Sequence, residues 1–206
     1  MVEQCHVLVF EKEHRQILAS VVVLTEAARR ELIDIGKAKF VSRLKIQLKD
    51  KLENIAIPRQ WRFLTQIPQN AQSKINKVYL KSLFQNVSLP VVLSQDILDD
   101  QIQQQLEFIP ELDCFKGHFP NCPIYPGVGQ IGFIQYFAKQ YWADLAWCNG
   151  MEQLKFQSLI RPYMTVTLNL KRKEHKISFE LKTEEKTLAS GRLVFALAAE
   201  QSEQQA

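Results

Sequence analysis

A loop crowded with backbone-restricting residues, followed directly by a long apolar helix pattern, constrains the fold of this chain most strongly. The loop lies in residues 114–133, which read "CFKGHFPNCPIYPGVGQIGF" and hold three of the eight prolines and four of the seven glycines. The helix pattern that follows reads "VGQIGFIQYFAKQYWADLAW". Because proline fixes φ and glycine allows close backbone approach, we expect a rigid loop that holds His118 in front of a buried helix.

Strand-like runs surround this helix. Before the loop, the chain reads "QIQQQLEFIP", with partial alternation of polar and apolar residues. After the helix come four further runs: "QLKFQSLI", "MTVTLNLKRK", "KISFELKTE" and "LASGRLVFALAA". One buried helix with a series of antiparallel strands predicts an α+β domain over residues 86–206.

Residues 1–85 predict a smaller α+β unit. Two β-rich runs, "CHVLVF" and "ILASVVVL", are separated by a charged segment and predict a hairpin. Thr25 is a candidate cap for a helix that Gly36 interrupts or bends and that ends before Pro58. A strand, "QWRFL", a loop, "IPQNAQSK", and a terminal helix, "NKVYLKSLF", complete the unit.

Charge divides the chain in the same way. Residues 1–85 hold 15 Lys and Arg against 8 Asp and Glu, whereas residues 86–206 hold 11 against 14. This asymmetry suggests two units of different origin. The lysines of the basic unit follow a helical pattern without interleaved exposed aromatic residues, so we expect a solvated helix face and no nucleic-acid partner.

Composition also limits location and cofactors. No run of about 18 apolar residues is present, which predicts no membrane span, and no signal peptide is evident at the N-terminus. The four cysteines form no CxxC pair, as is typical of reduced thiols in a cytoplasmic protein. Cys114, His118 and Cys122 are three possible metal ligands without a fourth, so we expect no metal.

The loop motif resembles that of a known enzyme family. The segment "GHFPNCPIYPGVGQ" is similar to the signature of β-hydroxyacyl thioester dehydratases, Gly-His-Phe-Pro-x-x-Pro-x-x-Pro-Gly-Val. The later segment "LKFQSLIRP" resembles that family's Lys-Phe-x-x-x-(Ile/Val)-x-Pro strand. Gln130 and the "SGR" of residues 190–192 are similar to the dehydratase-like domains of aryl-polyene and related lipid pathways. The resemblance covers residues 86–206 and implies a hotdog fold, an antiparallel sheet wrapped around one central helix.

The resemblance also implies a reaction. A 3-hydroxyacyl thioester, carried by acyl carrier protein or coenzyme A, would lose water in fatty-acid or polyene-type lipid synthesis. His118 would be the base, and a pKa near neutrality suits histidine to that role. The N–H of Gly127, followed by Val128 at the helix start, would bind the thioester carbonyl. No cofactor is implied, and the family's dimers, in which both subunits build the acyl tunnel, imply a homodimer.

The chain departs from the family at the acid. An Asp or Glu usually lies fourteen residues after the histidine, and this chain has Gly132 there. No carboxylate occurs between Phe115 and Ala138. Tyr136, one helical turn further on, is a candidate substitute acid, although its ordinary role would be core packing. Two alternatives therefore stay open: a hotdog thioesterase to which Gly132 admits water, and a non-catalytic acyl-binding module left from a longer synthetase fusion.

Residues 57–84 carry a second resemblance. The segment "IPRQWRFLTQIPQNAQSKINKVYLKSLF" is similar to the end of the C-terminal subdomain of AMP-forming acyl-CoA synthetases. That family's adenylate-contacting lysine corresponds to Lys74, while its preceding glycine is Ser73 here. The large nucleotide-binding domain has no counterpart in this sequence, so we expect Lys74 to be idle here, as a surface lysine. The alternative is that the unit completes a separate adenylating chain in trans.

Overall fold

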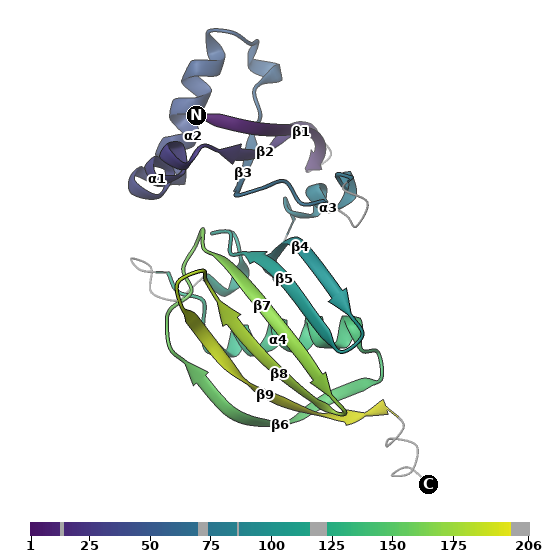
Figure 1. Ribbon diagram of the computed structural model, residues 1–206. Helices are drawn as coiled ribbons and strands as arrows, with labels where there is room; N and C mark the ends of the chain where they lie inside the picture. The colour runs from purple at the N-terminus through teal and green to yellow at the C-terminus, as the bar shows by residue number, and fades with distance from the viewer. Residues whose placement is uncertain (13–14, 70–73, 86, 116–122, 199–206) are drawn as a thin grey trace. The chain divides into compact units, whose positions relative to one another are not determined.

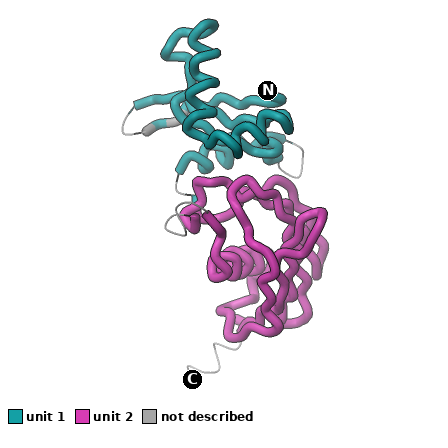
Figure 2. Tube along the Cα trace, turned by 90° about the vertical axis from the view of Figure 1, so that its left-hand side faces the viewer, with its two compact units in different colours: residues 1–87 teal, residues 88–206 magenta. Residues whose placement is uncertain are grey.

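The computed structural model describes residues 1–206 except for residues 13–14, 70–73, 86, 116–122 and 199–206. His118, Ser73 and Cys122 therefore lie outside the described residues. The chain divides into two compact units, Met1–Val87 and Ser88–Ala206 (Figure 2). Each unit is described by itself below.

The first unit is built on a three-stranded sheet in the order β1-β2-β3. Strands β1 (Val2–Lys12) and β2 (Arg15–Leu24) are antiparallel, which confirms the predicted hairpin. Strand β3 (Gln60–Leu64) runs parallel to β2, so the helices between them form a crossover. The other elements of this unit are α1 (Glu26–Ile35), α2 (Lys37–Lys49), η1 (Asn54–Ala56) and α3 (Lys77–Ser82).

Local sequence accounts for the helices of this unit. The Thr25 side chain accepts a hydrogen bond from the Ala28 N–H at 3.4 Å and caps α1, as predicted. Gly36 adopts φ +81°, a conformation that residues with a Cβ rarely adopt, and it separates α1 from α2. The expected interruption at Gly36 is thus a complete break between two helices.

The second unit contains a six-stranded antiparallel sheet in the order β4-β5-β7-β8-β9-β6. Helix α4 (Gly127–Tyr141) lies against one face of the curved sheet (Figure 1). The strands are β4 (Val91–Leu98), β5 (Gln101–Glu107), β6 (Leu145–Phe156), β7 (Thr165–Lys173), β8 (Lys176–Lys182) and β9 (Thr187–Leu197), and a short helix, η2, spans Asp113–Phe115. An antiparallel sheet around one helix is consistent with the expected hotdog-like α+β fold.

The core of this unit lies between α4 and the sheet. Buried residues alternate along β7 and β8, as a sheet with one covered face requires. On α4, the residues that face the sheet are Gln130, Ile131, Phe133, Ile134, Phe137 and Ala138. Within the described residues, no helix of either unit is both long and apolar enough to cross a membrane.

Candidate functional site

The start of α4 carries the clearest chemical feature of the second unit. Pro126 is the N-cap residue, with φ −70° and ψ 151°, and no side chain caps the helix. The first intrahelical bond in this turn runs from the Gln130 N–H to the Pro126 carbonyl at 3.0 Å. Helix geometry thus leaves the N–H groups of residues 127–129 without intrahelical acceptors, at the positive end of the helix dipole. The predicted helix start at Pro126 and Gly127 is confirmed.

An aromatic ring covers this helix start. A Cβ added to Gly127 would lie 3.1 Å from Cζ of Phe156, which is tighter than ordinary packing. Phe156 ends β6, and half of its surface is exposed. Glycine at 127 therefore lets the Phe156 ring pack closely against the backbone of this residue. Sequence reasoning did not single out Phe156, although it is the phenylalanine of the Lys-Phe motif quoted above.

The next glycine marks a tightly packed junction. A Cβ on Gly129 would lie 3.0 Å from both Cys114 Sγ and Tyr125 Cε1. Tyr125 is buried, its N–H donates to the Ile160 carbonyl at 2.8 Å, and its ring packs edge-on against Phe108 at 4.9 Å. Burial, together with the contact to Cys114, raises the pKa of the Tyr125 hydroxyl, so this residue stays neutral and serves packing.

The opposite side of α4 is open. Val128, Gly132 and Tyr136 recur every fourth residue and share one exposed face, with Val128 80% and Tyr136 44% exposed. A Cβ added to Gly132 would meet no atom within 4 Å. Steric crowding therefore does not explain why residue 132 is a glycine, and a longer side chain would have room there. The expected core-packing role of Tyr136 is wrong, because helix rotation carries its ring to the surface beside Phe137.

Two buried polar side chains lie near this site. Gln130 is only 4% exposed; its Nε2 donates to the Tyr125 carbonyl at 3.4 Å, while its Oε1 has no partner among the described residues. Glu107, at the end of β5, is fully buried, and no other acidic side chain of the described residues is. Its neighbour Phe108 packs against Tyr125. Glu107 lies before the range of residues 115–138 in which the resemblance places an acid, and its only sequence signal is a charge inside the apolar run "LEFI".

Residues 94–192 match the family model of the ApeI-like dehydratases, described as ApeI dehydratase. This ApeI-like region contains β5 to β8 and α4, and the start of the match lies within β4. It supports the predicted resemblance to dehydratases. It includes the positions of all candidate site residues except Lys74, and it lies within the second unit.

Two solved structures resemble about half of this chain, a share close to that of the family match. The dehydratase heterocomplex ApeI:P from Xenorhabdus doucetiae is 28% identical, covering 52% of this chain and 97% of that one, with a TM-score of 0.49. An uncharacterised protein from Erwinia carotovora subsp. atroseptica is 26% identical, covering 53% and 98%, with a TM-score of 0.45. No curated protein matches the chain.

The predicted site residues do not all lie in the part of the second unit that the structure describes. His118 lies outside the described residues, whereas Gly127, Val128, Gly132 and Tyr136 all lie on α4. Lys74 is exposed in the first unit and precedes Ile75, which forms an isolated bridge with Gln69. In the described part of the chain, no group of three or more His, Cys, Asp or Glu side chains could hold a metal ion.

Proposed function

We propose that the second unit is a dehydratase that converts a 3-hydroxyacyl thioester into the trans-2-enoyl thioester. The acyl group would be carried by acyl carrier protein or coenzyme A, in fatty-acid or polyene-type lipid synthesis in the cytoplasm. One observation carries the proposal: the ApeI-like region contains a helix start with no side-chain cap, at a glycine that an exposed aromatic ring covers.

The helix start suits the charge that forms during this reaction. When a base removes the α-proton, negative charge develops on the thioester oxygen. The Gly127 N–H and the helix dipole can bind that oxygen, and one such donor is typically worth about 3–4 kcal/mol of transition-state stabilisation. His118, ahead of Pro126 in the chain, is the proposed base. Val128 follows Gly127 on the exposed side of the turn, where it can contact the acyl group.

The departing hydroxyl needs a proton. The C–O bond at C3 breaks as the double bond forms, and the hydroxide leaves as water once it is protonated. Tyr136 is the proposed substitute donor, because it is exposed on the same face as Gly132 and its hydroxyl forms no hydrogen bond with the described residues. An acid contributes about 10²- to 10⁴-fold, so replacing it should slow a working enzyme strongly.

A homodimer would cover the open side of α4. Val128 and Tyr136 are exposed there, and Trp147 and Met151 of the edge strand β6 are about half exposed. Met151 pairs with buried Leu193, so it belongs to the sheet face that covers α4, at the edge where that cover ends. Exposed apolar side chains on a helix and an unpaired strand edge favour association.

Light scattering after size exclusion tests the dimer. Met151→Glu should shift the mass to that of a monomer, whereas Leu98→Glu, on the other edge strand β4, should not. A monomeric wild-type chain would contradict the homodimer. The heterocomplex ApeI:P described for Xenorhabdus doucetiae would then direct attention to a different partner chain.

Mass spectrometry tests the reaction. The full chain is incubated with a 3-hydroxyacyl group on acyl carrier protein, and separately with the trans-2-enoyl product. Loss or gain of one water is expected, abolished in His118→Ala and preserved in His175→Ala, a matched histidine of the same unit. An intact, folded protein that interconverts neither compound would overturn the dehydratase.

A thioesterase is the second candidate, favoured by the open space at Gly132, which admits water. It would release free thiol from the same substrates, and a thiol reagent added to the incubation detects this. Binding of the acyl thioester with neither dehydration nor thiol release would instead support the non-catalytic acyl-binding module.

For the first unit, we propose an adenylating-type subdomain in which Lys74 is idle; the alternative is that the unit acts with a separate nucleotide-binding chain. The support is limited to the resemblance of residues 57–84 and the exposed position of Lys74. Under the alternative, an added adenylating domain would form acyl-adenylate faster with this chain than with its Lys74→Ala variant. Equal rates with both chains would leave Lys74 as a surface residue.

A further inference from the structure

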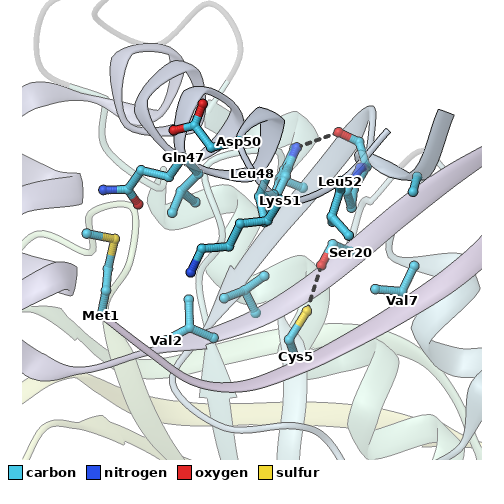
Figure 3. Close-up of a pocket in the computed structure, with 15 residues that line it drawn as sticks. Met1, Val2, Cys5, Val7, Ser20, Gln47, Leu48, Asp50, Lys51 and Leu52 are labelled. Carbon is cyan, nitrogen blue, oxygen red and sulfur yellow. Dashed lines mark hydrogen bonds between the residues drawn. The ribbon is translucent and has the colours of Figure 1, made fainter. Parts of the chain in front are cut away.

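The first unit contains a pocket of about 710 Å³ between the second half of α2, strand β1 and the start of β3 (Figure 3). This volume is typical of small-molecule sites. The pocket belongs to this unit alone, and its lining is mostly apolar. The lining includes the side chains of Val7, Ser20, Val22, Gln47, Lys51 and Trp61.

The pocket exists because α2 fills only half of the sheet face beneath it. Strand register places Cys5 beside Val22, and Val7 and Trp61 on either side of Ser20, all on one face. Under the first half of α2, Phe40 packs edge-on against Phe63 at 5.5 Å and is buried. Under the second half, the floor consists of the small side chains of Ser20 and Cys5, joined Oγ to Sγ at 3.1 Å.

The pocket has one polar end. In Figure 3 the Lys51 ammonium and the Gln47 amide lie toward Met1 and Val2, whereas Val7 lies at the opposite end and the Asp50 carboxylate points away. Lys51 forms no side-chain hydrogen bond or ion pair with the described residues. The positive charge at this end is therefore available to a ligand.

We propose that this pocket binds an amphiphilic carboxylate, such as a medium-chain fatty acid. The alkyl chain would lie over Val7, Val22 and Trp61, and the carboxylate would meet the Lys51 ammonium. Charge complementarity selects the anionic head, and the net charge of +7 over residues 1–85 acts in the same direction. This inference is independent of the reaction proposed for the second unit.

The two parts of the ligand should contribute differently. Burial of each added methylene is expected to tighten binding about fourfold, until the pocket is full. A solvent-accessible ion pair with Lys51 should add only roughly two- to fivefold. Chain length should therefore dominate affinity, and the head group should set the orientation.

Calorimetric titration of the full chain with octanoate, decanoate and dodecanoate, below their micelle concentrations, tests the proposal. Affinity should rise through the series, and decanoate should bind more tightly than decanol or decylamine. Lys51→Met should remove the preference for decanoate, whereas Lys49→Met, the last residue of α2 and outside the lining, should keep it. Equal loss in both variants would overturn the assignment to Lys51.

A second pair of measurements locates the ligand. Val7→Phe, at an exposed position of the wall, should fill the pocket and abolish binding without unfolding the chain. Decanoate should change the tryptophan fluorescence of the wild type, and Trp61→Phe should lose that change. Undiminished binding in Val7→Phe, or no binding to the folded wild type, would overturn the pocket. A second outcome would also overturn the proposal: the chain binds no carboxylate but self-associates, and Val7→Glu abolishes that self-association. The pocket would then be an interface between copies of the chain.

Discussion

Helices α4 and α2 each leave one space unfilled. On α4 the space is on the side that faces away from the sheet, and on α2 it is on the side that faces the sheet. α4 fills its sheet-facing side with Phe133, Ile134 and Phe137, and its vacancy is Gly132 on the exposed side. α2 fills its sheet-facing side only as far as Leu44, and its vacancy is the pocket beneath its second half. Because interdigitated side chains exclude other molecules, no ligand fits between α4 and its sheet, whereas the space beneath the second half of α2 can admit one.

Truncating a side chain on the sheet-facing side of α4 should lower the free energy of unfolding more than any other change compared in these two helices. Phe133→Ala removes a ring that packs against Phe108 and Tyr125 at 5.8 Å, and should destabilise the second unit by about 3–5 kcal/mol. Leu48→Ala, in the half-filled wall of the pocket, should cost less than about 2 kcal/mol, because its side chain is already partly exposed. Urea unfolding followed by circular dichroism measures both. Equal costs would mean that the two helices are packed alike.

The vacancy on α4 should accept a carboxylate. Gly132→Asp places an acid where the dehydratase family carries one, in a position with no atom within 4 Å of the added Cβ. If a missing proton donor limits the proposed reaction, the rate of dehydration should rise about tenfold to 100-fold. Gly132→Asn, which has the same shape without the acid, is the matched control. An equal rise in both variants would show that filling the space, and not proton donation, is responsible.

Two glycines three residues apart, Gly129 and Gly132, lie on the packed and the exposed side of α4. Gly129→Ala forces a Cβ to within 3.0 Å of Cys114 and Tyr125 and should destabilise by about 1–3 kcal/mol. Gly132→Ala meets nothing and should stabilise by up to about 1 kcal/mol, through helix propensity. Thermal unfolding midpoints of the two variants should shift in opposite directions. A shift in the same direction would contradict this placement of the two faces.

Local sequence signals predicted the helices and the β1–β2 hairpin, but not the pairings between distant strands. The helix pattern quoted as far as Trp147 was wrong at its end, because α4 stops at Tyr141 and β6 begins at Leu145. The cap at Thr25, the break at Gly36 and the start of α4 each depend on residues a few positions apart. Strand β4 was not predicted, and neither was the parallel alignment of β3 with β2, since strand partners are set by distant residues. For the same reason sequence could not place Phe156 over Gly127, 29 residues earlier in the chain, or show that α2 leaves a pocket.

The start of α2 offers a pH dependence that is confined to the first unit. Burial, with a smaller contribution from nearby Arg62, lowers the pKa of Lys37 from 10.5 to about 7. Between these values the unfolded chain binds a proton that the folded chain has released, so stability should rise as the pH increases from 7 toward 10. Lys37→Met removes this titration and should flatten the rise, whereas Lys39→Met, exposed on the same helix, should keep it. Urea midpoints measured across this pH range separate the two variants, and an unchanged slope in Lys37→Met would show that the charge of Lys37 is accommodated in the folded unit.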